Sequence, residues 1–130
     1  LSAAVAISNK AALAQQQGNL LEAEKLYRES LQAFDKNSNK DLPAFVETSQ
    51  NLAVLLTEIG RFDEAITLLD EAMSLVKKLE STVSTRLTIA MLNKKGNALL
   101  RAARLDESLK AYLLAAGQAR RGTAEWIIAG

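Results

Sequence analysis

The sequence predicts an all-α fold made of three tandem helix–turn–helix units. Similar stretches surround positions 18, 60 and 103, so a unit recurs every 42 to 43 residues, and a period of this size is typical of repeat proteins. On both sides of each marker position, apolar residues recur at the spacing of one helix face. Ala and Leu dominate and only 5% of the residues are aromatic, which favours closely approaching helices over a β-sheet core.

The first unit is expected to consist of helices over about 3–17 and 20–36. They flank Gly18, and glycine tolerates the left-handed conformation that ends a helix. Asn19 follows as the predicted N-cap of the second helix, with Glu22 three residues later as in a capping box. The pattern therefore predicts a tight turn between two helices.

The second unit is expected to consist of helices over about 43–59 and 62–79. The polar stretch KNSNKDLP precedes it and ends in a proline, which suits the first turn of a helix. Gly60 takes the turn position. Acidic residues at 63–64 then lie in the first turn of the next helix, where the helix dipole favours negative charge.

The third unit is expected to consist of helices over about 84–102 and 105–120. The stretch ESTVST before it offers several hydroxyl groups as helix caps. Ala103 stands at the turn position that glycine holds in the other two units, and acidic residues at 106–107 again follow the turn.

The last stretch, 121–130, is interpreted either as a cap on the array or as the beginning of a fourth unit. Trp126 and the two isoleucines after it are apolar and need cover. We expect Trp126 to pack on the helix over 105–119, with contact to a neighbouring chain as the alternative. The prediction is thus a single domain, 1–130, with units at about 3–36, 43–79 and 84–120.

Small side chains recur at three places in every unit. A small residue lets two helix axes approach, and bulky residues further along fill the remaining space. In this pattern the chain resembles the tetratricopeptide repeat family over residues 5–120, in the long-helix form of kinesin light chains. The small positions are Ala11, Ala53, Gly96, Ala23, Ala65, Ser108, Ser30, Ala72 and Ala115, and the large ones are Leu20, Phe62, Leu105, Tyr27, Leu69 and Tyr112.

The resemblance implies an α–α superhelix in which the first helix of each unit lines a concave groove. It also implies a protein–protein interaction module whose groove holds a peptide or helix of a partner and so scaffolds or regulates a complex. Amide side chains suit this role because they both donate to and accept from a peptide backbone. The groove residues implied by the register are Val5, Ser8, Asn9, Ala12, Gln16, Glu47, Gln50, Asn51, Val54, Glu58, Ala90, Asn93, Lys94, Asn97 and Arg101.

Charge is unevenly distributed although the net charge is only +1. Residues 1–80 carry eight Lys/Arg and twelve Asp/Glu, whereas residues 81–130 carry eight and three, so an acidic ligand would prefer the C-terminal third. Lys94 and Arg101 could meet one carboxylate there. The five-position clamp by which some members of the family hold chaperone tails is matched at only two positions, which argues against that ligand.

The alternative to a groove binder is a structural spacer or self-association segment of a longer array. The chain starts without a methionine, which suggests a piece of a longer protein. In either case we expect a monomer or weak self-association.

The chain lacks the residues that several classes of function require. Cys and His are absent, which excludes disulfides and leaves little for acid–base catalysis or metal binding, so we expect no enzyme and no cofactor. Few aromatics accompany the basic residues, which argues against nucleic acid. No apolar run is long enough to span a bilayer, and the first residues lack a basic leader. These features favour an intracellular soluble location, in the cytoplasm or an organelle lumen or stroma.

Overall fold

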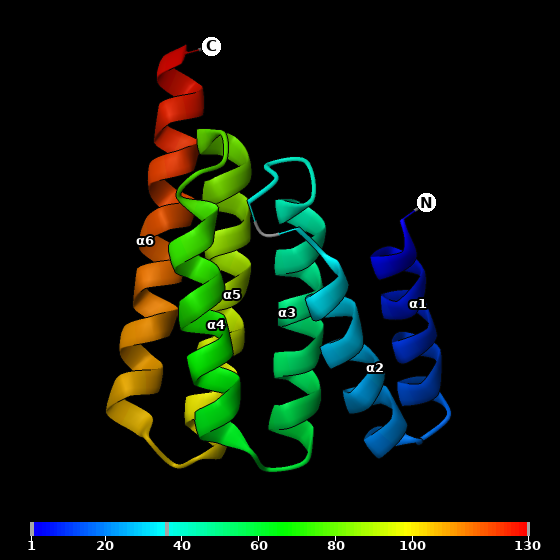
Figure 1. Ribbon diagram of the computed structural model, residues 1–130. Coiled ribbons are helices and arrows are strands. Elements are labelled where there is room, and N and C mark those ends of the chain that lie inside the picture. The colour runs from blue at the N-terminus through cyan, green and yellow to red at the C-terminus, as the bar shows by residue number, and fades with distance from the viewer. Residues whose placement is uncertain (1, 36, 130) are drawn as a thin grey trace.

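The computed structural model of the chain contains six α-helices and, among the described residues, no β-strand (Figure 1). It describes residues 2–35 and 37–129, with side chains up to residue 121. Five of the six predicted helices begin and end within three residues of the observed bounds. The helices are α1 Ala3–Gln16, α2 Leu20–Ala33, α3 Leu42–Glu58, α4 Phe62–Val76, α5 Ser81–Arg101 and α6 Leu105–Ala129.

The sixth helix is longer than predicted. The sequence indicates an end near residue 120, but α6 continues to Ala129 and extends beyond the level at which α5 begins (Figure 1). The backbone of residues 121–129 is therefore continuous with α6. The predicted packing of Trp126 concerns a side chain outside the described ones.

Each unit turns at its marker residue, as predicted. The φ angle is 81° at Gly18, 85° at Gly60 and 63° at Ala103, so all three lie in the left-handed region. After the second marker, the Arg61 amide donates to the Leu56 carbonyl at 2.8 Å, and equivalent bonds close the other two turns. This is the Schellman motif, in which glycine is favoured, and a residue with a Cβ costs about 1 kcal/mol at such a site.

The helix caps differ partly from the prediction. Asn19 is the N-cap residue of α2, but its side chain makes no capping hydrogen bond, so the predicted capping box is wrong. At α5 the Glu80 carboxylate accepts from the Thr82 amide at 3.0 Å, so a carboxylate caps this helix and the expected hydroxyl groups do not. Pro43 lies in the first turn of α3, as predicted.

All nine small positions are buried. Two of them also bond across to the neighbouring helix, since the Ser30 hydroxyl donates to the Ala4 carbonyl at 2.6 Å and the Ser108 hydroxyl donates to the Gly96 carbonyl at 2.8 Å. A Cβ atom added to Gly96 would lie 2.7 Å from the half-buried Tyr112 ring. The small residues therefore sit where helices cross closely.

Bulky residues at the predicted large positions are less exposed in the first two units than at the start of α6. Tyr27 and Leu69 are each 1% exposed, and Leu20 and Phe62 are half-buried. The prediction that Leu105 fills a gap in the same way is wrong, because this residue is 61% exposed. α3 and α5 pack against α2 and α4, whereas no helix of the described chain packs on the corresponding side of α6.

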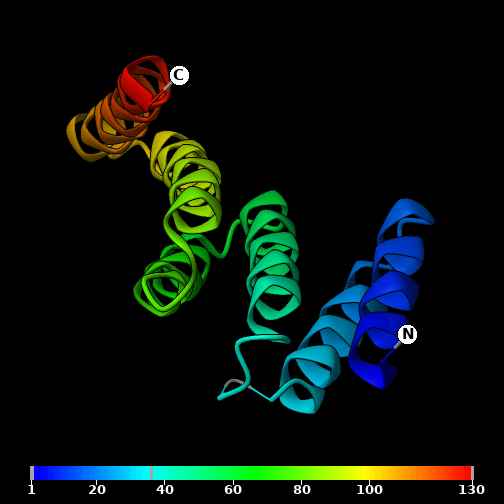
Figure 2. The ribbon, with the colours of Figure 1, turned by 90° about the horizontal axis from the view of Figure 1, so that it is seen from above.

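The helices form one curved array (Figure 2). Each first helix packs on the second helix of the preceding unit, α3 on α2 and α5 on α4, and first helices also contact each other, α1 with α3 and α3 with α5. Between α2 and α4 the described backbones do not approach each other, and the Arg28–Glu64 ion pair bridges the two helices. The second helices therefore diverge on the outer side, and the first helices line the inner side. The shape is that of an all-α solenoid.

Candidate functional site: the concave face

α3 exposes one stripe of side chains along its length. Glu47, Asn51 and Glu58 are exposed and Val54 is half-buried, and their spacing of three or four residues places them on one helix face. Most other α3 side chains are buried, because α1, α2, α4 and α5 all pack against this helix. The middle first helix can thus meet a partner mainly through this stripe.

α1 and α5 carry corresponding stripes, and both helices lie on the inner side of the array (Figure 2). Their exposure agrees with the register expected for a groove, while their role in binding stays a prediction. On α1, Asn9 and Gln16 are exposed and Val5, Ser8 and Ala12 half-buried, and on α5, Asn93, Asn97 and Arg101 are exposed and Ala90 and Lys94 half-buried.

Gln50 does not fit the predicted groove surface. Its exposure is only 5%, so it can supply little contact area to a partner. The physical reason is its position on a helical stripe with Val46, Ala53 and Thr57, all of which are buried. Gln50 belongs to the packed face of α3, one residue away from the exposed Asn51.

A hydrogen-bonded chain fixes one end of the concave face. The Tyr27 hydroxyl donates to the Gln15 side-chain carbonyl at 2.9 Å, and the Gln15 amide donates to the Glu58 carboxylate at 3.4 Å. Burial and the negative charge of Glu58 both raise the pKa of Tyr27. The sequence prediction misses Gln15 and places its neighbour Gln16 in the groove. Gln15 could have been found as the amide next to Gln16 that lies close enough to the buried Tyr27 to accept a hydrogen bond from its hydroxyl group.

Two further hydrogen bonds involve predicted groove residues. The Tyr112 hydroxyl donates to the Asn97 side-chain carbonyl, and the Thr48 hydroxyl donates to the Ser8 hydroxyl at 3.1 Å, which links α3 to α1. Tyr112 is the equivalent of Tyr27, so in two units a tyrosine of the second helix orients an amide of the first. Such bonds restrict side-chain motion before any partner binds, which lowers the entropic cost of binding.

The basic groups of the α5 stripe are free of internal partners among the described residues. Lys94 and Arg101 make no ion pair there, whereas the adjacent Lys95 binds Asp70 of α4 at 2.8 Å. Arg101 lies toward the turns, where it lines a hollow of about 510 Å³ together with the Gly60 turn. The structure thus leaves two cations of the concave face available to an anionic group.

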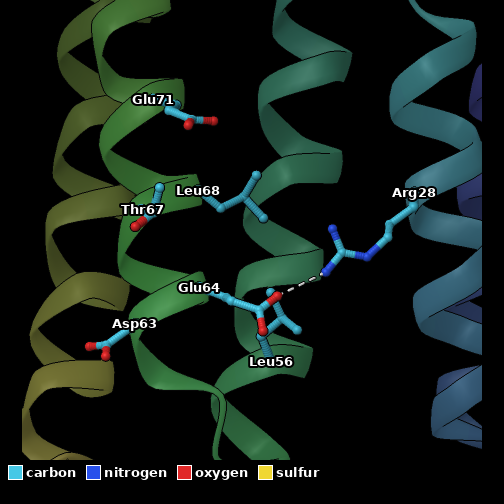
Figure 3. Close-up of a pocket in the computed structure, with 7 residues that line it drawn as sticks. All are labelled: Arg28, Leu56, Asp63, Glu64, Thr67, Leu68 and Glu71. Atoms are coloured by element: carbon cyan, nitrogen blue, oxygen red, sulfur yellow. Dashed lines mark hydrogen bonds and ion pairs between the residues drawn. The ribbon is translucent and has the colours of Figure 1, made fainter.

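The outer side of the array carries a furrow that the sequence did not indicate. Its larger part, about 350 Å³, lies between α2 and α4 over α3 (Figure 3). Leu56 and Leu68 form the apolar part of its lining, and a second hollow of about 210 Å³ continues it along α4. We call this feature the convex furrow. It arises because the second helices diverge, and no local sequence pattern reports that divergence.

An ion-pair network borders the convex furrow and joins the first two units. Arg61 contacts Glu24 and Glu64, each at 2.7 Å, and Arg28 contacts the same two carboxylates at 2.9 and 3.2 Å (Figure 3 shows the Arg28–Glu64 pair). Burial alone would raise the pKa of Glu24, but the hydrogen bonds and charges of the two arginines outweigh it and lower that pKa. The hydrogen bond from Arg61 likewise lowers the pKa of Glu64. These charges satisfy one another and leave little for a ligand.

The described residues contain no group of three His, Cys, Asp or Glu side chains placed to hold a metal ion. Within the same part of the chain, no helix has both the length and the apolar character that crossing a membrane would need.

Comparison with known proteins agrees with this geometry. Residues 2–78 match the sequence profile of the tetratricopeptide repeat, a helical repeat that generally mediates protein–protein interactions. A segment of 60 residues is 37% identical to the clustered mitochondria protein homolog of Candida albicans, and the match covers 46% of this chain and 4% of that protein. The chain thus spans a small fraction of the length of the curated relative it matches.

Proposed function

Because the chain belongs to the tetratricopeptide repeat family, we propose that it is a binding module whose concave face holds an extended or helical segment of another protein. The observation that carries this proposal is the alignment of three exposed stripes on α1, α3 and α5, of which the central stripe lies on a helix that is otherwise largely buried. A preformed surface of this kind binds without first ordering its own backbone.

The stripes favour a partner segment whose backbone N–H and C=O groups are free to form hydrogen bonds and whose acidic residues lie near α5. Asn9, Asn51, Asn93 and Asn97 are all exposed on the three first helices, and amides can pair with the donors and acceptors of a peptide backbone. Arg101 is a cation without an internal partner in the described structure, and guanidinium groups bind carboxylates in a bidentate manner. The α3 stripe is instead acidic through Glu47 and Glu58, so a segment with a basic part and an acidic part would match both helices.

Selection from a random peptide library displayed on phage tests this proposal while leaving the choice of partner sequence open. The selected peptides are then measured by fluorescence anisotropy against the wild-type chain and against Asn51→Ala combined with Arg101→Glu. Both positions are exposed, so folding should be preserved, which circular dichroism checks. We expect enrichment of acidic residues and at least about a tenfold loss of affinity, since a bond to a charged group contributes about 1.5–3 kcal/mol.

The matched control places two substitutions on the convex furrow. Thr67→Ala combined with Glu71→Arg changes exposed residues of α4 and should leave the affinity unchanged. If the concave variant binds as tightly as the wild type while the convex variant loses affinity, the binding face is the outer one and the proposal fails.

The alternative function is a structural segment within a longer array. This alternative is worth testing because the match covers only 4% of the Candida albicans relative, and a short segment of a long protein can serve mainly to connect the parts on either side of it. In that case the library should yield no peptide whose binding depends on Asn51 and Arg101.

We further infer a location inside the cell, in the cytoplasm or an organelle, which imaging of the tagged parent protein tests.

A further inference from the structure

α6 exposes a row of leucines at the end of the array. Leu105, Leu109 and Leu113 are 61%, 58% and 61% exposed, and their spacing of four residues places them along one side of the helix. A different side of α6 is buried through Ser108, Ala111 and Ala115, and α6 packs against α5. We call the three exposed residues the α6 leucine stripe.

The two apolar residues among the α4 equivalents are less exposed than the leucines of α6. Phe62 is half-buried and Ile66 is 9% exposed, while Asp70, the equivalent of Leu113, binds Lys95 of α5. A following unit with a lysine like Lys95 would find Leu113 in place of the carboxylate that α4 offers, so this ion pair could not form. The leucine there instead fits a partner surface that is apolar at this position.

We propose that a second copy of this chain covers the α6 leucine stripe by packing its own α6 against it in antiparallel orientation. A twofold axis passing between residues 112 and 113 would place Leu109 of each copy opposite Ala116 of the other, so that a large side chain meets a small one. The same axis would bring Asp106 near Arg120 of the partner. Both residues are exposed, and neither forms an ion pair within the described chain, so the ends of the two helices are complementary in charge.

Stacking of copies from head to tail fits the surfaces less well. The α1 position equivalent to the buried Leu52 is Lys10, which is exposed. The equivalent Lys95 pairs with Asp70 where α5 packs on α4, whereas a following copy that packed its α1 on the leucine stripe would place Lys10 near Leu113, which offers no carboxylate, and an unpaired charge is disfavoured there. The twofold arrangement places Arg120 at the end of the contact, beside Leu105 and Asp106 of the partner, so its charge has a carboxylate nearby, and the arrangement closes as a dimer rather than continuing as a fibre.

The size of the stripe indicates a weak dimer. Three leucines that are each about 60% exposed present on the order of 300 Å², which is at the lower end of functional apolar patches. An interface centred on them falls below the roughly 800 Å² per partner of a standard stable complex. A dissociation constant in the micromolar range is the expected consequence.

Sedimentation equilibrium of the 130-residue chain tests the dimer between about 5 and about 500 μM. We expect the mean mass to rise from that of the 14.1 kDa monomer toward twice that value. Leu109→Glu should weaken association at least tenfold. The matched control Leu21→Glu changes a leucine of α2 that is 84% exposed and should have no effect.

Charge exchange tests the antiparallel geometry separately. Asp106→Arg and Arg120→Asp should each weaken the dimer, and the double variant should regain most of the wild-type affinity because the pair is restored in reverse. A chain that stays monomeric over the whole range, a dimer that survives Leu109→Glu, or a mass that grows beyond the dimer would each overturn the proposal. Since none of these residues lies on the concave face, the outcome is independent of peptide binding.

Discussion

The second and third units place apolar residues at equivalent positions, but their burial differs widely. Ile66 of α4 is 9% exposed, whereas its equivalent Leu109 of α6 is 58% exposed. Both residues are branched aliphatic side chains, so their own chemistry does not explain the difference. What differs is the neighbour, since α5 packs on α4 and no described helix packs on that side of α6. In a solenoid, the place of a unit in the array decides how much of its apolar surface is covered.

The two units also reach close packing in different ways. Leu55 of α3 is fully buried, and the equivalent residue of α5 is Ala98, which is buried as well. α5 therefore presents a smaller side chain, and its backbone contacts with α4 are more extensive than those of α3 with α2. A buried alanine is typical of a site that leaves little room for a larger side chain.

The largest change in stability is expected when a buried side chain of α3 is shortened. Leu55→Ala should lower the free energy of unfolding by about 2–5 kcal/mol, because it leaves a cavity in the most enclosed helix. Ala98→Leu adds volume where the helices lie close, and it should cost about 1–3 kcal/mol. Urea unfolding followed by circular dichroism measures both. A loss for Leu55→Ala smaller than that for Ala98→Leu would contradict the view that α3 forms the centre of the core.

At the turns of the second and third units, substitutions are expected to change stability by a smaller amount and with opposite signs. Gly60 has a φ of 85° and Ala103 one of 63°, so Gly60→Ala should destabilise the chain and Ala103→Gly should stabilise it, each by about 1 kcal/mol. The control is Gly117→Ala within α6, where an added Cβ meets no atom within 4 Å. That change should stabilise by up to about 1 kcal/mol through helix propensity alone.

The signs of these turn variants decide the interpretation. If Ala103→Gly lowers stability, the alanine makes contacts that outweigh its backbone strain. The same urea titrations, with equal m values, give the answer.

The fold could be predicted from the sequence because its determinants are local and repeated. Small residues such as Ala53 and Ala65 recur at fixed intervals, and all nine are buried as predicted. The turn at Gly60 needs a residue that tolerates positive φ, which is also visible in the sequence. Helix ends were less predictable, since the side chain of Asn19 does not cap α2 despite a favourable pattern.

The candidate site was only partly predictable because it depends on how helices from different units meet. The exposed stripe through Asn51 follows from helical periodicity, so the sequence indicates it. The bond from Gln15 to Glu58 depends on the separation of α1 and α3, which no single unit encodes. The convex furrow beside Leu68 depends in the same way on the divergence of α2 and α4.

The smallest effect is expected from the arginines that follow the second and third turns, Arg61 and Arg104. Arg61 binds Glu24, whose side chain is 13% exposed, whereas Arg104 binds Asp63, whose side chain is 93% exposed. The pKa of Glu24 is lowered below its usual value of 4.5 in the folded chain, because the arginine hydrogen bonds and charges outweigh the effect of burial. A lowered pKa in the folded state means that protons bind the unfolded chain more readily. This pair therefore stabilises the fold above about pH 4.5, and the contribution is lost as the pH falls below that value.

Arg61→Met keeps most of the aliphatic stem and removes the charge, so it should reduce the fall in unfolding free energy below pH 4.5. Arg104→Met should leave that acid dependence nearly unchanged, because water screens an ion pair as exposed as that with Asp63. Urea titrations at several pH values between neutrality and about pH 3 measure both slopes. Equal slopes in the two variants would mean that the partly buried pair between the first two units is no more stabilising than its exposed counterpart. In that case the apolar contacts alone would distinguish the two junctions.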